Sequence, residues 1–237
     1  PADWVTAIET LRSGLNGVSI LAGLLSGRNT NEEAFLFAQL MRKISQEVHL
    51  EVFYKERDLS EVEMVLKSPD QSPNFRGARE MGVSSNTSFD EWVQNLLKGK
   101  FQGVYIVGED PVSQISDSVE IERALGQLSF LAVQDTHLTP TGRLAHVLIP
   151  ATNFAEKDGT YTNRNGRIQR IRPALNPPPG VLQDWETFNR LSKEERNSST
   201  PERIFRQIST EVSRYNGLDY ESIGTHGRFP TSLTGLL

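Results

Sequence analysis

Cysteine is absent from all 237 residues of the chain. This absence excludes disulfides, thiolate nucleophiles, Fe–S ligation and cysteine-based zinc sites within these residues. Long apolar runs are missing as well, since none approaches the roughly 20 residues that a helix needs to cross a bilayer, and the N-terminus has no signal-peptide pattern. We therefore expect any electron-transfer cofactor to be held in another segment or subunit, and any membrane association to come through partner subunits.

Basic residues are outnumbered by acidic ones. The chain has 25 Lys and Arg against 30 Asp and Glu, a formal net charge of -5. Nucleic acid is not an expected partner, because phosphate binding relies on clustered Lys and Arg. Hydrophobic residues make up 37% and charged residues 23% of the chain, which is the composition of an ordinary globular protein.

The familiar catalytic motifs are also missing. There is no GxxxxGK[ST] or GxGxxG phosphate loop and no GxSxG nucleophile turn. The four histidines, at positions 49, 137, 146 and 226, are isolated in sequence and lack the spacing of a zinc site. We interpret them as ordinary polar residues.

Apolar strands alternate with amphipathic helices along the first two thirds of the chain. Helices are expected over residues 4–15, 31–46, 89–97 and 117–125, and strands over residues 18–25, 50–54, 101–107, 130–133 and 146–149. The second helix begins with a capping box between Thr30 and Glu33. Because each strand is almost continuously apolar, we expect an α/β fold: a mostly parallel, Rossmann-like sheet with flanking helices.

The rest of the first domain is less regular. Residues 55–90 are polar and contain two Ser-Pro pairs, which favours a surface excursion with a helical turn over residues 61–66. Asn165-Gly166, a pair that favours type I′ turns, predicts a small hairpin over residues 161–168.

A run of three prolines and a glycine over residues 177–180 indicates a boundary. We therefore expect a Rossmann-like domain over residues 1–175 and a C-terminal helical extension over residues 176–237. Helices are predicted there over residues 184–191 and 201–214, and the Gly-rich end from Asn216 is expected to be loosely held.

Polar residues follow two central strands of the predicted sheet. Gly108, Glu109, Asp110 and Pro111 follow one strand, and Gln134 and Asp135 end the next. Open α/β sheets bind ligands at this edge, where Gly108 would let the backbone approach a nucleotide and the carboxylates would accept hydrogen bonds. An ordinary strand-ending turn explains the same residue types. Both interpretations stay open.

The predicted hairpin carries a basic cluster, which consists of Arg164, Arg167, Arg170 and Arg172. Guanidinium groups could hold phosphates by forked hydrogen bonds. Solvated arginines, or an interface with an acidic subunit, explain the cluster equally well.

Residues 130–169, FLAVQDTHLTPTGRLAHVLIPATNFAEKDGTYTNRNGRIQ, resemble a segment of the molybdopterin oxidoreductase superfamily. The matching positions are Gln134-Asp135, Glu156-Lys157-Asp158-Gly159-Thr160, Asn163, Gly166, Arg167 and Gln169, and outside this segment Asp3-Trp4, Ala7, the turn Gly108 to Pro111 and Asp184-Trp185. His146 and Asp110 depart from the family, which usually has Asp and Asn there. The resemblance implies that residues 108–111, Gln134, Asp135, Arg167 and Gln169 are the remains of a nucleotide or pterin site.

Within the superfamily, residues 72–82 resemble a segment of the large Fe–S subunit of NADH:quinone oxidoreductases (complex I). This resemblance implies a scaffold region with no catalytic residue, metal or cofactor of its own. In such an enzyme electrons pass from FMN through Fe–S clusters in another part of the protein. The implied partners are other subunits of a respiratory complex, peripheral to the cytoplasmic face of the membrane.

Two other functions stay open. The chain could be part of a molybdopterin guanine dinucleotide-dependent oxidoreductase such as a formate dehydrogenase. It could also be a free-standing nucleotide-binding module, which a GDP titration without heat or thermal shift would exclude.

Overall fold

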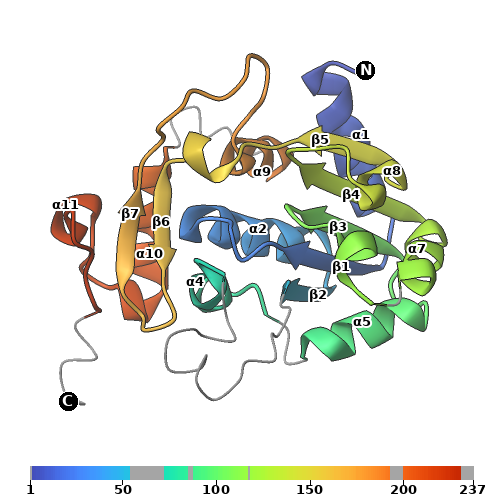
Figure 1. Ribbon diagram of the computed structural model, residues 1–237, viewed down its shortest axis with the longest axis horizontal. Coiled ribbons are helices and arrows are strands. Elements are labelled where there is room, and N and C mark those ends of the chain that lie inside the picture. The colour runs from blue at the N-terminus through green and yellow to red at the C-terminus, as the bar shows by residue number, and fades with distance from the viewer. Residues whose placement is uncertain (1, 54–71, 85–87, 117, 193–199, 231–237) are drawn as a thin grey trace.

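The computed structural model describes residues 2–53, 72–84, 88–116, 118–192 and 200–230. Its centre is a five-stranded sheet in the order β2-β1-β3-β4-β5 (Figure 1). The strands are β1 (Ile20–Leu25), β2 (Glu47–Val52), β3 (Gly103–Val107), β4 (Phe130–Asp135) and β5 (Val147–Pro150). Every neighbouring pair in this sheet is parallel, which confirms the predicted α/β fold.

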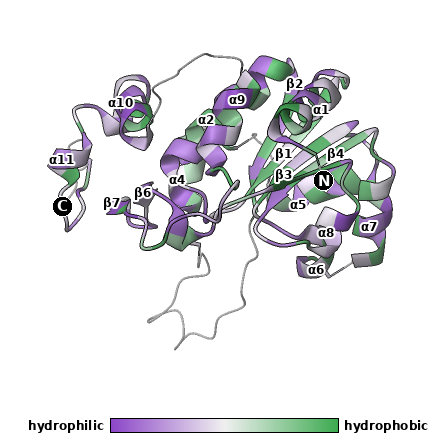
Figure 2. Ribbon diagram, turned by 90° about the horizontal axis from the view of Figure 1, so that it is seen from above, coloured by the Kyte–Doolittle hydropathy of each residue, from purple (hydrophilic) through white to green (hydrophobic). Residues whose placement is uncertain are grey.

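Helices cover both faces of the sheet. One face packs against α1 (Trp4–Asn16), α2 (Asn31–Ile44) and α9 (Asp184–Ser192), and the other against α5 (Phe89–Leu97) and α7 (Ser118–Gly126). Along β3, Tyr105 belongs to the first core and its neighbour Ile106 to the second, because successive side chains of a strand point to opposite faces. Figure 2 shows the apolar strands between the more polar helices. Burial on both faces explains the continuous apolar runs.

The part of the chain that contains the sheet also has short helices, and one of its strands begins earlier than predicted. The short helices are α4 (Phe75–Glu80), α6 (Pro111–Gln114), α8 (Pro140–Arg143) and the 3-10 helix η1 (Phe154–Glu156). Strand β2 begins three residues before the predicted strand at residue 50. Its first residues were missed because Glu47 is exposed, Val48 and His49 are only partly buried, and one valine between two polar residues gives no continuous apolar run. The helical turn predicted over residues 61–66 lies outside the described residues.

The hairpin is present, but its turn differs from the prediction. It consists of antiparallel strands β6 (Gly159–Thr162) and β7 (Ile168–Ile171), and Thr162 is paired with Ile168. Residues 163–167 therefore form the loop, and a two-residue type I′ turn at Asn165-Gly166 is wrong. The side chain of Asn163 organises the loop, since its Oδ1 accepts hydrogen bonds from the amides of Asn165 and Arg167, each at 3.0 Å.

The C-terminal part contains α10 (Pro201–Glu211), the 3-10 helix η2 (Ser213–Tyr215) and α11 (Tyr220–Ile223). The expected loose end from Asn216 is wrong as far as residue 230, because Leu218 and Ile223 are buried in the core. Arg228 also exchanges two backbone hydrogen bonds of 2.8 Å with Ile168 of β7. Helices α9 and α10 share the core of α2, and the division at residues 175/176 stays a prediction.

Candidate functional site

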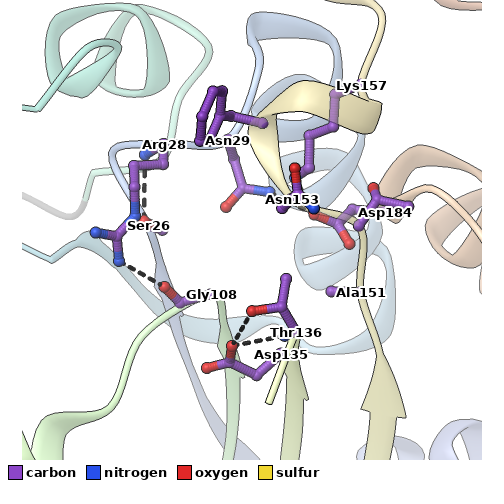
Figure 3. A pocket seen from close by; sticks show the side chains of 12 residues that line it. Ser26, Arg28, Asn29, Gly108, Asp135, Thr136, Ala151, Asn153, Lys157 and Asp184 are labelled. Atoms are coloured by element: carbon purple, nitrogen blue, oxygen red, sulfur yellow. Dashed lines mark hydrogen bonds and ion pairs between the residues drawn. The ribbon is translucent and has the colours of Figure 1, made fainter. Parts of the chain in front are cut away.

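A cavity of about 170 Å³ lies at the carboxyl edge of the parallel sheet. It lies where strand order reverses, because β2 pairs on one side of β1 and β3 on the other, and such reversals are where open α/β sheets bind ligands. The lining residues are Ser26, Arg28, Asn29, Gly108, Asp135, Thr136, Ala151, Thr152, Asn153, Phe154, Lys157 and Asp184. In Figure 3, Ser26 and Arg28 lie on one side of the cavity and Lys157 and Asp184 on the other.

Gly108 forms a tight turn at the end of β3. Its φ of 72° lies in the left-handed region, and an added Cβ would lie 3.1 Å from the Cβ of Ser26. Glycine adopts this conformation without the steric cost that other residues have. Arg28 Nη2 donates to the Gly108 carbonyl at 3.2 Å, so the turn is also linked to the loop after β1.

Glu109 is buried, contacts the cavity-lining residues Ser26 and Arg28, and has partners on both carboxylate oxygens. Ser26 Oγ donates to Oε1 at 2.5 Å and Gln114 Nε2 donates to Oε2 at 2.7 Å. Arg28 forms an ion pair with Oε1 at 3.2 Å. Burial raises the pKa of Glu109, and the hydrogen bond from Ser26 and the charge of Arg28 partly offset this rise.

Asp110 links two short helices through its side chain, and Pro111 begins one of them. Asp110 Oδ1 accepts hydrogen bonds from Thr141 Oγ1 at 2.5 Å and Thr141 N at 3.0 Å, which ties α6 to α8. Burial acts to raise the pKa of Asp110, but hydrogen bonds from Ser113 and Thr141 outweigh it and the pKa is lowered. Pro111 is the first residue of α6. Neither residue lines the cavity.

The polar pair at the end of β4 divides between core and cavity. Gln134 is fully buried; it accepts from Tyr105 Oη at 2.5 Å and donates to Asp184 Oδ1 at 2.6 Å. Asp135 lines the cavity, and its Oδ1 accepts from the amide of Thr136 at 2.6 Å. The two sequence predictions that meet at the cavity are therefore Gly108 and Asp135.

A buried cluster of polar and charged residues lies at the cavity: Asn29, Lys157 and Asp184 line it, and Glu33 contacts them from the interior. Lys157 Nζ lies 3.0 Å from Glu33 Oε2 and 2.5 Å from Asp184 Oδ2. Asn29 Nδ2 donates to the same two carboxylates at 3.0 and 2.8 Å. Burial acts to lower the pKa of Lys157, but the charges of Asp184 and Glu33 outweigh it and the pKa is raised. Burial raises the pKa of Glu33, and the charge of Lys157 only partly offsets this rise.

Sequence reasoning did not name these four residues as site residues. Signals existed, since Lys157 and Asp184 both belong to segments that resemble the family, and Glu33 was predicted to close a capping box. That box is present, with Thr30 N donating to Glu33 Oε2 at 2.9 Å. The contact between Lys157 and Asp184, 27 residues apart, depends on how η1 and α9 are placed in three dimensions.

Arg167 and Gln169 do not line the cavity. Both are exposed on the hairpin, where Arg167 donates to the carbonyl of His226 at 3.4 Å and lies 5.0 Å from the ring centroid of Phe229. Arg170 differs from its neighbours because it points inward, where it pairs with Asp158 at 2.5 Å and stacks on Tyr220.

The described residues contain no cluster of three or more His, Asp or Glu side chains with the placement of a metal site. His146 has a structural contact, since its Nδ1 accepts from the amide of Leu131 at 3.0 Å. Across the same described ranges, no helix combines the length and apolar character needed to span a membrane.

Comparison with known proteins identifies the family. The family model "Molybdopterin oxidoreductase" matches residues 27–194. This chain belongs to the molybdopterin oxidoreductase family, which confirms the resemblance found in the sequence.

Two kinds of relative are similar to the chain. "F420-dependent formate dehydrogenase subunit alpha" of Methanocaldococcus jannaschii is 40% identical over 62% of this chain and 22% of its own length. The second G-type subunit of the NADH-quinone oxidoreductase of Rhizobium meliloti is 31% identical over 95% of this chain and 29% of its own length. The chain thus spans less than a third of these relatives.

Among solved structures, an exopolyphosphatase-related protein from Bacteroides fragilis gives a TM-score of 0.38 at 11% identity, over 62% of this chain and 38% of that chain. This likeness is too weak to support an argument.

Proposed function

We propose that this chain is a scaffold region of the large Fe–S subunit of an NADH:quinone oxidoreductase, with no cofactor of its own. The observation that carries the proposal is the extent of one match. The Rhizobium NADH-quinone oxidoreductase relative aligns over 95% of the chain, so the alignment necessarily reaches into residues 176–237, whereas the Methanocaldococcus formate dehydrogenase aligns over 62%. Within the stretch covered by the Rhizobium relative, helices α9 and α10 pack on α2 in one hydrophobic core.

The chemistry of the sheet edge supports this proposal. Glu109, Asp110, Gln134 and Lys157 each bind partners within the chain, so a ligand that needed them would have to break existing hydrogen bonds or ion pairs. Glu109, Gln134 and Lys157 are buried, and leaving such groups unpaired costs roughly 1–3 kcal/mol each.

The cavity is also small for the family's cofactor. Its volume is about 170 Å³, whereas small-molecule sites usually enclose roughly 300–1,000 Å³. This small volume supports a role in which the chain holds no molybdopterin guanine dinucleotide of its own.

In the proposed role the chain positions other components and transfers no electron. The parent protein would hold Fe–S clusters in another segment, and FMN would belong to the same assembly. Partners would be other subunits of a respiratory complex, and the assembly would lie peripherally at the cytoplasmic face of the membrane. The names of both relatives describe them as subunits, which supports a multi-subunit parent.

The experiment that tests this function is deletion of the gene for the parent protein, with complementation as control. Membranes are assayed for NADH-driven quinone reduction, and whole extract for formate-driven dye reduction. We expect the NADH-driven rate to be lost and restored by the intact gene, while formate oxidation is unchanged. Loss of formate oxidation with intact NADH-driven quinone reduction would contradict the proposal.

A formate dehydrogenase is the second candidate, and the higher identity of 40% to a relative of that name favours it. In that case Gly108 and Asp135 would contact the nucleotide end of a pterin cofactor, and the cofactor would supply the redox centre. Segments outside this chain would then have to complete the site. The deletion experiment separates the two candidates because they predict the loss of different activities.

A further inference from the structure

Five arginines from four segments of the chain gather at the loop of the hairpin, residues 163–167. They are Arg76 of α4, Arg164 and Arg167 of the loop, Arg214 of η2 and Arg228 beside β7, and we call them the arginine face. Arg76 Nη1 donates to the carbonyl of Arg164 at 2.9 Å. The guanidinium groups of Arg76 and Arg214 both lie within 3.0 Å of the position that a Cβ on Gly166 would occupy. Backbone pairing with Ile168 places Arg228 next to Arg167.

Few carboxylates neutralise this face. Glu80 pairs with Arg76 at 2.8 Å and with Arg214 at 3.0 Å. Within the described ranges, no carboxylate pairs with Arg164, Arg167 or Arg228. Five arginines against one glutamate leave a formal excess of four positive charges, on a chain whose net charge is -5. Nη2 of Arg214 is buried and has no hydrogen-bond partner in the part of the chain that the structure describes.

The composition of this face matches that of protein–protein interfaces. Phe229 is 43% exposed, and the guanidinium of Arg167 stacks on its ring. Arginine and exposed aromatic residues are enriched in such interfaces. Like charges held close together repel one another, and an acidic partner would remove that repulsion.

We propose that the arginine face docks an acidic segment of another protein subunit. Guanidinium groups bind carboxylates through two parallel hydrogen bonds, which gives such a contact geometric specificity. Nucleic acid is a poorer occupant because a long polyanion extends beyond the arginine face and is repelled by the net negative charge of the rest of the chain. A short acidic segment interacts mainly with the charges within a Debye length of about 8 Å, which are those of the face itself. The inference rests on this surface alone and holds for either parent enzyme.

The test uses the native assembly, isolated through a tag on the full-length parent protein. The variant R164E/R167E reverses two exposed charges of the face. The matched control R123E/R143E makes the same charge change at exposed positions of α7 and α8. We expect retention of one subunit to fall about tenfold or more in R164E/R167E and to stay unchanged in the control. Equal loss in both variants, or no loss in either, would overturn the proposal.

A second variant tests the chemistry of the partner and keeps the positive charge of the face. The substitutions R164K/R167K introduce amines, which a carbodiimide joins directly to carboxylates. We expect crosslinks to an Asp- or Glu-rich segment of the subunit that R164E/R167E loses. Crosslinks confined to this chain, or a complete absence of crosslinks, would overturn the proposal. If R164E/R167E instead releases RNA or phospholipid and retains every subunit, the proposal is also overturned, and the arginine face would be a site for phosphate groups.

Discussion

Replacing Lys157 with methionine is the sharpest test of how the cavity wall is stabilised. The Lys157 side chain is 6% exposed, and its ammonium group contacts Glu33 and Asp184, whose side chains are 1% and 2% exposed. Methionine keeps the length and apolar stem but leaves two carboxylates without their cation. Breaking a buried ion pair by removing one partner costs roughly 3–5 kcal/mol. For a domain of this size each kcal/mol lowers Tm by about 2–4 °C, so we expect a fall of roughly 10 °C.

The loss of folding stability in K157M should depend on pH. Burial already raises the pKa of Glu33, and removal of Lys157 takes away the charge that opposes this rise. A carboxyl group whose pKa is higher in the folded state stabilises the fold at low pH, and that contribution is lost as pH rises from the unfolded pKa to the folded pKa. The deficit of K157M should therefore be largest near pH 8 and smaller near pH 5.

The assay is equilibrium urea unfolding of the wild type and variants at pH 5 to 8. K100M, at an exposed lysine, is the control and should change the free energy of unfolding by no more than about 0.5 kcal/mol. The double variant K157M/D184N should recover part of the loss, because it removes one of the two uncompensated charges. A K157M deficit within about 1 kcal/mol of the control at pH 8 would refute the reasoning.

Three further predictions concern other parts of the fold. Burial raises the pKa of Glu32 from 4.5 to about 7, so the free energy of unfolding of the wild type should fall as pH rises between these values. In urea unfolding, E32Q should reduce that fall by up to about 3 kcal/mol. An identical pH slope in both proteins would contradict this. Tyr220 Oη donates to Glu32 at 2.8 Å. Y220F should therefore lower the free energy of unfolding by about 1–3 kcal/mol at pH 8 and speed amide hydrogen exchange over residues 218–223. Unchanged exchange in these residues would count against this prediction. Gly108 has a φ of 72°, so G108A should lower the stability by about 1–2 kcal/mol in a thermal melt. The control G126A, where an added Cβ meets no atom within 4 Å, should be neutral or stabilising. Equal effects of the two substitutions would show that the positive φ of Gly108 is not the cause.

The parallel sheet could be predicted because its signal is local. The central strands β1, β3 and β4 are short apolar runs buried on both faces. The helix over residues 31–44 begins with a capping box whose two partners are three residues apart in sequence. The placement of Gly108 and Asp135 at one cavity followed from a general rule, since carboxyl ends of neighbouring parallel strands meet at the same edge. These predictions needed no knowledge of long-range packing.

The remainder depended on tertiary contacts that sequence spacing does not reveal. Lys157 meets Glu33 across 124 residues, and Tyr220 meets Glu32 across 188. The same kind of contact explains why the Gly-rich end is docked as far as residue 230: a few apolar side chains and one backbone bridge hold it against the core and β7. The hairpin loop was mispredicted because the side chain of Asn163 competes with the Asn-Gly pair that favours a tighter turn.

The most direct test of the proposed function is the cofactor content of the native parent assembly, isolated with an antibody to this chain. Iron, FMN, molybdenum and tungsten would be quantified in the same preparation. The proposed scaffold role predicts abundant iron with FMN, and neither molybdenum nor tungsten. Stoichiometric molybdenum or tungsten with extractable pterin would contradict it and would make Gly108 and Asp135 candidate cofactor contacts.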